Sequence, residues 1–221
     1  MDMKFILGRI AKCLLTILAV TFIVFALMQC NDEGDPGSIM LAKPVIYLYP
    51  EETTDVTVKL DVTGQLTAVY PAYEDGWHVT AAPDGTLTDE NGRSYYCLYW
   101  EAESDTDYDL SQGFCVPGES TAAFLEDALA KLGLTEREAN EFIIYWLPQM
   151  QANPYNLISF QTDVYEAHAK LAVEPAPDTL IRVFMAWQPL KAPVDVDPQT
   201  LTAPARTGFT VVEWGGAQVH P

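Results

Sequence analysis

The sequence predicts an α+β protein, a mainly antiparallel, β-sandwich-like domain with an inserted pair of amphipathic helices, preceded by an N-terminal membrane-anchor helix. Three observations predict this class. Residues 5–28 are almost continuously apolar, most later segments alternate apolar and polar residues, and two central segments repeat at helical spacing. A chain of 221 residues with 49% apolar residues suits one such domain plus an extra segment.

Residues 1–30 form the predicted anchor. At helical rise the run from Phe5 to Met28 reaches about 36 Å, enough to span a bilayer with tilt. Lys4, Arg9 and Lys12 precede or edge its continuous part from Cys13 to Met28, and acidic residues follow it, which orients the N-terminus inside. Two alternatives stay open, a lipoprotein-type signal with lipidation at Cys30 and an ordinary cleaved signal. All three place the rest of the chain outside the cytoplasm, and the membrane is a predicted partner through this segment.

The charge balance excludes one class of function. The net charge is −19, and the part after residue 30 carries −21 because three basic residues and one acidic residue lie within 1–30. Such a surface opposes phosphate backbones, so we expect no nucleic-acid binding. Calcium, a basic envelope protein or a neutral glycan is an easier partner, and a solvated acidic surface with no partner is the plain alternative.

The predicted elements begin after an acidic linker at 31–42, and the exported domain is placed at 43–221. Val45–Tyr49 is a continuous apolar run typical of a buried central strand. Alternation then predicts a series of further strands: Val56–Val62, Leu66–Tyr70, Trp77–Ala81, Arg93–Glu101, Leu157–Thr162, Ala169–Glu174, Leu180–Trp187 and Phe209–Trp214.

Two helices interrupt this series. The first is expected at about 120–132, with Gly133 as its stop. The second begins at Thr135 and Glu138, which have capping-box spacing. Pro148 should kink or end it near Leu147.

Cys97 and Cys115 are the two cysteines of the exported domain. Export to an oxidising compartment and a loop of about 19 residues favour a disulfide between them, worth roughly 3 kcal/mol. Two free thiols are the alternative. The spacing of the cysteines gives no zinc motif.

Two Glu-Trp pairs are the candidate chemistry. Glu213 shares a strand face with Phe209 and Val211, and Glu101 shares one with tyrosines. An apolar wall favours the protonated carboxylic acid, so Glu101 and Glu213 are candidate catalytic carboxylates of a hydrolase. Nearby aromatic side chains are candidate sugar-binding residues: Trp100, Trp214 and Tyr99. The alternative is that both glutamates lie at strand ends and face solvent.

An acidic run offers a candidate calcium site. Five carboxylates alternate from Glu101 to Asp109, and in an extended chain they would point the same way. The candidate ligands are Asp105, Asp107 and Asp109, and a solvated acidic loop is the alternative. No other cofactor is expected, since the chain carries no P-loop, dinucleotide fingerprint or nucleophile elbow.

Five segments give the domain a resemblance to known sequences. They are KPVIYLYP (Lys43–Pro50), PDGTLTDENG (Pro83–Gly92), YWLPQM (Tyr145–Met150), YNLISFQT (Tyr155–Thr162) and GFTVVEWGG (Gly208–Gly216). They resemble a group of uncharacterised bacterial exported or membrane-anchored proteins. The resemblance implies a common fold and an envelope location, and it implies no activity, cofactor or catalytic residue.

The sequence thus favours a non-enzymatic, membrane-anchored binding module of the bacterial cell envelope. A carboxylate-based hydrolase acting on glycans with Glu101 and Glu213 is the rival hypothesis. The two differ in one geometric requirement. The hydrolase needs both carboxylates to converge in one cleft.

Overall fold

The computed structural model describes residues 38–219. The predicted anchor at 1–30, the candidate lipidation site Cys30 and residues 31–37 of the predicted linker lie outside the described residues. Within 38–219, no helix is both long and apolar enough to cross a membrane. The first strand, β1 (Ile39–Tyr49), begins at Ile39, inside the predicted linker of 31–42.

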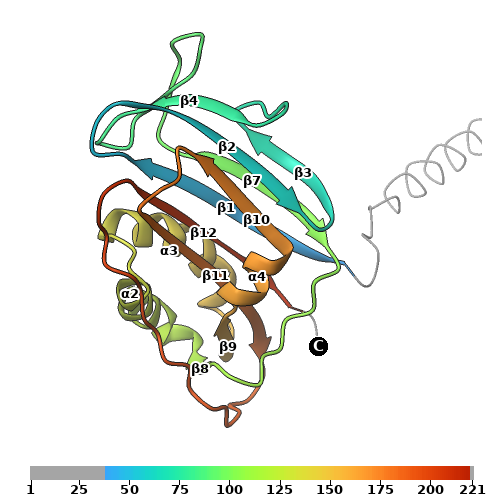
Figure 1. Cartoon of the computed structure of the whole chain (residues 1–221). Helices are drawn as coiled ribbons and strands as arrows, with labels where there is room; N and C mark the ends of the chain where they lie inside the picture. The colour runs from blue at the N-terminus through green and yellow to red at the C-terminus, as the bar shows by residue number, and fades with distance from the viewer. Residues whose placement is uncertain (1–37, 220–221) are drawn as a thin grey trace, which may run out of the picture. The chain divides into compact units, whose positions relative to one another are not determined.

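The larger sheet has seven strands, with β1 in its interior (Figure 1). In spatial order they are β3 (Gln65–Tyr70), β7 (Leu98–Ser104), β1, β12 (Thr210–Gln218), β11 (Thr179–Leu190), β9 (Tyr155–Phe160) and β8 (Phe114–Pro117). All neighbours are antiparallel except β11 and β12, which are parallel. The prediction that Val45–Tyr49 belongs to a buried central strand is confirmed.

The smaller sheet has five strands. In spatial order they are β10 (Ala169–Glu174), β2 (Thr54–Val62), β4 (Trp77–Ala81), β5 (Leu87–Thr88) and β6 (Ser94–Tyr95). In β2 the apolar side chains of Val56 and Val58 are buried, whereas Asp55 and Lys59 on either side of this pair are exposed. This period of two lays one face of the small sheet against the large one.

Two of the helices pack on the opposite face of the large sheet. The predicted pair is present as α2 (Thr121–Lys131) and α3 (Glu136–Met150), and a short η1 (Gly118–Ser120) precedes them. A third helix, α4 (Thr162–His168), was not predicted. The capping box between Thr135 and Glu138 is formed, and Gly133 ends α2 with a positive φ of 87°.

Pro148 does not end α3 near Leu147, because the helix continues through it to Met150. Proline at this position removes the hydrogen bond to the carbonyl of Ile144. Ile144 and Pro148 both lie on the exposed side of α3, where water can solvate that carbonyl.

Two apolar cores therefore cover the two faces of the large sheet. One lies between the sheets and includes Trp77 and Phe184, and the other lies under the helices and includes Phe142 and Trp214. The α+β class with two sheets and an inserted helical pair is confirmed. The ring of Phe142 on α3 meets Trp214 on β12 edge to face at 5.2 Å, so α3 lies over the middle of the sheet rather than over the β7–β3 edge.

The long strand predicted at Arg93–Glu101 is two strands in two different sheets. It breaks at Tyr96 and Cys97, where the chain leaves β6 of the small sheet and enters β7 of the large one. Aromatic residues stand on both sides of the break, which is why the sequence suggested one strand. The crossing brings Tyr95, Tyr96 and Tyr99 to the uncovered edge of the large sheet.

Candidate functional site

Glu213 lies in the core between the two sheets. Its side chain is fully buried, and its Oε2 accepts a 2.6 Å hydrogen bond from Arg182 Nε. Its Oε1 accepts a 2.9 Å hydrogen bond from the indole Nε1 of Trp100. The guanidinium of Arg182 also stacks over the Tyr165 ring, 4.5 Å from its centroid. The carboxylate is thus neutralised and held inside the protein, as a buried charge requires.

Glu101 lies on the other face of the same sheet. Trp100 and Ala102 belong to the core between the sheets, so Glu101 between them points to the helix side, whereas Glu213 points to the small sheet. The two carboxylates do not converge in one cleft, and the hydrolase pair is not formed. The prediction failed because it compared each glutamate only with neighbours on its own strand.

The two tryptophans offered as sugar-binding residues are part of the cores. Trp100 and Trp214 are both fully buried, one on each face of the large sheet. Neither ring can stack on a sugar. The Gly215-Gly216 pair after Trp214 continues β12, where a Cβ on Gly216 would come within 2.6 Å of the Met185 carbonyl oxygen.

The predicted disulfide is wrong, because Cys97 and Cys115 are both free thiols. Cys97 precedes β7 and Cys115 lies in β8, and four strands separate β7 from β8 in the sheet. At a strand spacing of about 4.8 Å the separation is on the order of 24 Å, far beyond the reach of a disulfide. Closeness along the chain favoured a bridge that the sheet order prevents.

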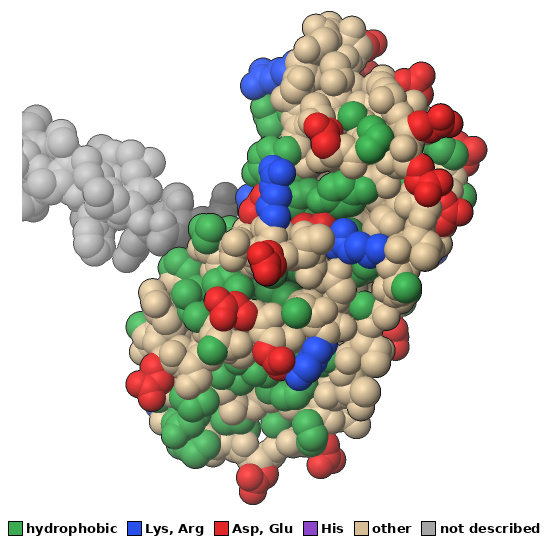
Figure 2. All heavy atoms as spheres, turned by 90° about the vertical axis from the view of Figure 1, so that its left-hand side faces the viewer, with side chains coloured by type: hydrophobic (Ala, Val, Ile, Leu, Met, Phe, Trp, Pro, Cys, Tyr) green, Lys and Arg blue, Asp and Glu red, His purple; other side chains and the backbone are tan. Residues whose placement is uncertain are grey.

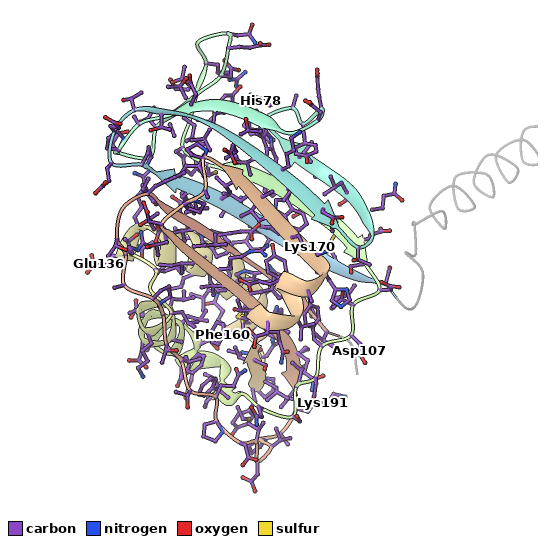
Figure 3. The ribbon with its side chains drawn as sticks, in the orientation of Figure 1. His78, Asp107, Glu136, Phe160, Lys170 and Lys191 are labelled. Atoms are coloured by element: carbon purple, nitrogen blue, oxygen red, sulfur yellow. The ribbon has the colours of Figure 1, made fainter. Side chains whose placement is uncertain are left out.

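The acidic run does not form a calcium site. Asp105, Asp107 and Asp109 are all exposed, and they alternate with the buried Thr106 and Tyr108. Along an extended chain such side chains are about 6.6 Å apart, and these point into solvent. Among residues 38–219 no group of three or more His, Cys, Asp or Glu could hold a metal ion. Figure 3 marks Asp107 on a loop at one side of the domain.

A groove lined by tyrosines lies on the helix-side face of the uncovered sheet edge. It has a volume of about 400 Å³, and we call it the tyrosine groove. The residues that line it are Lys43, Val45, Tyr70, Ser94, Tyr95, Tyr96, Cys97 and Tyr99. They come from β1, from the end of β3, from β6, from the crossing between the sheets and from β7. Figure 2 shows Lys and Arg side chains beside hydrophobic ones across the middle of one face of the domain.

Lys43 enters the groove from a bulge in β1. The pairing of β1 with both neighbours shifts register between residues 41 and 45, and Lys43 has a left-handed φ of 59°. Its backbone N–H donates a 3.2 Å hydrogen bond to Oε1 of Glu101, which holds the bulge. Left-handed backbone is costly for a residue with a Cβ, and it recurs at functional sites.

The Lys43 ammonium group lies over two tyrosine rings. It is 5.2 Å from the ring centroid of Tyr99 and 5.8 Å from that of Tyr145 on α3, within the range of cation–π attraction. Partial burial and the neighbouring Glu101 raise the pKa of Tyr99, so its hydroxyl stays protonated and can donate a hydrogen bond. Of the predicted site residues, Tyr99 and Glu101 meet beside this groove, whereas Trp100 and Glu213 meet in the core between the sheets.

The outer rim of the groove is aromatic and basic. Arg93 Nη2 donates a 2.9 Å hydrogen bond to the Tyr70 hydroxyl, and its guanidinium lies 5.6 Å from the centroid of Tyr95. Arg137 on α3 lies over the Tyr96 ring. Tyr70 and Tyr96 are about half exposed, at 49% and 52%. The rings therefore present large surfaces to solvent while their positions are fixed by neighbours.

The sequence alone did not single out Lys43, Tyr70, Tyr95 and Tyr96 as site residues. The consecutive tyrosines before Cys97 were a usable signal, because adjacent aromatic residues in a strand must point to opposite faces unless the chain changes direction. The left-handed backbone of Lys43 had no such signal, since a residue before proline is expected to be extended.

The domain is an α+β domain with an aromatic groove at the edge of its large sheet. No family model and no solved structure matches the chain. A stretch of 87 residues, 38% of the chain, is 37% identical to the "Uncharacterized protein in bglA 3'region" of Butyrivibrio fibrisolvens and covers 90% of that protein. The chain belongs to the same family as this Butyrivibrio protein.

Proposed function

We propose that the chain is a membrane-anchored binding module facing outside the cytoplasm, and that its tyrosine groove binds a neutral glycan. The observation that carries the proposal is the groove itself, in which four tyrosine rings stand beside Lys43 at a bulge in the sheet. The apolar run at residues 5–28 and the charges that flank it support the anchor and its orientation.

The chemistry of the groove suits a sugar. Pyranose rings present C–H groups on one face and hydroxyls around the edge, so they need flat rings together with hydrogen-bonding groups. Tyr96 and Tyr99 supply the rings, and Arg93, Lys43 and the tyrosine hydroxyls supply polar contacts. The net charge of −21 after residue 30 disfavours anionic polymers and leaves neutral glycans as the easier ligands.

The tyrosine groove is built on a packed sheet, so binding a glycan should cost little conformational entropy of the protein. The floor is a central sheet with buried side chains on its other face, including Leu98 and Trp100. Tyrosine loses few rotamers on binding, so a preformed tyrosine surface keeps most of its contact energy as affinity.

The test is a microarray of neutral oligosaccharides probed with the full chain in detergent micelles, followed by titration calorimetry with the best glycan. We expect Tyr96→Ala and Tyr99→Ala each to raise Kd about tenfold, since one ring contact is worth about 1.4 kcal/mol. Tyr155→Ala is the matched control, because Tyr155 lies in β9 outside the groove and should bind like wild type. Absence of any bound glycan, or equal affinity in all three variants, would overturn the proposal.

A further inference from the structure

A second concave region lies where β9 ends beside the first half of β11. β9 pairs with β11 only from Met185 onward, and at Phe160 the chain turns away into α4. Figure 3 marks Phe160 close to α4. A notch with a volume of about 810 Å³ opens at this point, bounded by α4, by the end of α2 at Leu132 and by the irregular segment 199–204.

The backbone of β11 is only partly hydrogen-bonded along the notch. The carbonyl of Phe184 accepts a hydrogen bond from Gln161 N–H, and that of Arg182 accepts one from the Thr162 hydroxyl. The backbone N–H and C=O groups of the even-numbered residues of β11 therefore point away from β12. By the alternation of a strand, the N–H and C=O of Leu180 point into the notch as well. Among residues 38–219 neither the strand pairs nor the hydrogen bonds of the structure give these two groups of Leu180 a partner on this side.

At the end of β9, a side-chain amide makes the two hydrogen bonds that a neighbouring strand would make. The Gln199 amide accepts from Phe160 N–H at 2.8 Å and donates to the Phe160 carbonyl at 2.9 Å. These two groups of Phe160 face away from β11, and on the β11 side no side chain within 38–219 serves Leu180, which is 37% exposed, in the same way. An open strand edge of this kind is a template for an additional strand.

The two sides of the notch differ in chemistry. The helix side is apolar, since Leu132, Ile181 and Leu201 belong to or pack against the core under the helices. The other side carries the exposed carboxylates of Asp163 and Glu166 on α4, which contacts β10 and β11. A strand added here would turn alternate side chains toward apolar and toward acidic surroundings.

We propose that the notch binds an extended peptide in which basic and apolar residues alternate, as an additional strand on β11. The open backbone groups of Leu180 supply main-chain hydrogen bonds. The carboxylates of Asp163 and Glu166 select basic side chains on one face, and the apolar wall receives the other face. Thr179–Arg182 extends about 13 Å, so three to four residues of the peptide make these contacts. This site is independent of the tyrosine groove, from which β12 separates it within the sheet.

The probe is a fluorescein-labelled octapeptide of alternating lysine and valine, titrated by anisotropy into the full chain in detergent micelles at 150 mM salt. Three comparisons define the result. They are the same peptide with alternate backbone nitrogens methylated, a glutamate–valine octapeptide, and hydrogen exchange of the segment around 180–182 with and without the probe.

We expect the lysine–valine peptide to bind, the methylated and acidic peptides not to bind, and exchange around 180–182 to slow at least about tenfold. The double variant Asp163→Asn/Glu166→Gln should raise Kd about fivefold. The matched control Glu51→Gln/Glu52→Gln removes two exposed charges elsewhere and should leave Kd unchanged. No binding of the probe, equal binding of the methylated peptide, equal loss in both double variants, or no slowing of exchange would each overturn the proposal.

Discussion

The Arg182 guanidinium and the Glu213 carboxylate form an ion pair inside the domain, with Nε and Oε2 2.6 Å apart. The exposures of their side chains are 2% and 0%, so water screens neither charge. Trp100 and Tyr165 complete the cluster from β7 and α4. The pair joins the parallel strands β11 and β12, where these two residues are in register. We expect the pair to favour that register, since any slip of one strand would separate two buried charges.

Replacing Glu213 alone should therefore be strongly destabilising. Glu213→Ala leaves the Arg182 charge buried without a partner, and we expect a loss of about 3–5 kcal/mol of unfolding free energy. Urea denaturation of the full chain in micelles, followed by tryptophan fluorescence, measures it. The double variant Glu213→Leu/Arg182→Met removes both charges, and it should recover most of the loss. A double variant as unstable as Glu213→Ala would contradict this account.

Glu213 shows which features of a buried side chain the sequence can predict and which it cannot. Alternation with Phe209 and Val211 placed the Glu213 carboxylate on an apolar face, and its complete burial confirms that placement. Its partner Arg182 is 31 residues earlier, and only the parallel pairing of β11 with β12 makes them neighbours. Periodicity predicts which way a side chain points on its own strand, whereas strand order decides what it meets.

Strand order also explains why the tyrosine groove was not predicted from the sequence. The tyrosines at 95–99 are visible in the sequence, but the groove exists because the chain changes sheets at Tyr96. The helices were predictable because apolar spacing and the capping box at Thr135 act locally. The notch beside β11 arises where β9 ends early, and a strand's length relative to its neighbour is set by the fold.

Replacing Lys43 should change the free energy of unfolding and the glycan affinity in different ways. Its φ of 59° suits glycine, so Lys43→Gly relieves backbone strain that Lys43→Ala retains, while both remove the ammonium from Tyr99. We expect Lys43→Gly to be about 1 kcal/mol more stable than Lys43→Ala in urea denaturation. Both variants should lose glycan affinity to a similar degree. Equal stability of the two variants would show that the bulge carries no strain relieved by glycine.

Cys97 reports on the groove through its thiol, which lines the groove beside Tyr96. Burial, reinforced by the nearby Glu141 carboxylate, raises the pKa of Cys97 from 9.0 to about 11. A raised pKa means less thiolate at a given pH, so alkylation by iodoacetamide should be slow at pH 8 and still rising at pH 10. The same shift stabilises the fold fully below pH 9, and this contribution is lost as the pH rises toward 11.

Alkylation at Cys97 also tests occupancy of the groove. Peptide mass spectrometry after timed labelling separates Cys97 from Cys115, which lies in β8 outside the groove and serves as the internal control. A saturating bound glycan should slow labelling of Cys97 several-fold and leave Cys115 unchanged, because the ligand covers one thiol and not the other. Equal protection of both cysteines would point to a general stabilisation of the fold, and no protection of Cys97 would place the glycan elsewhere on the domain.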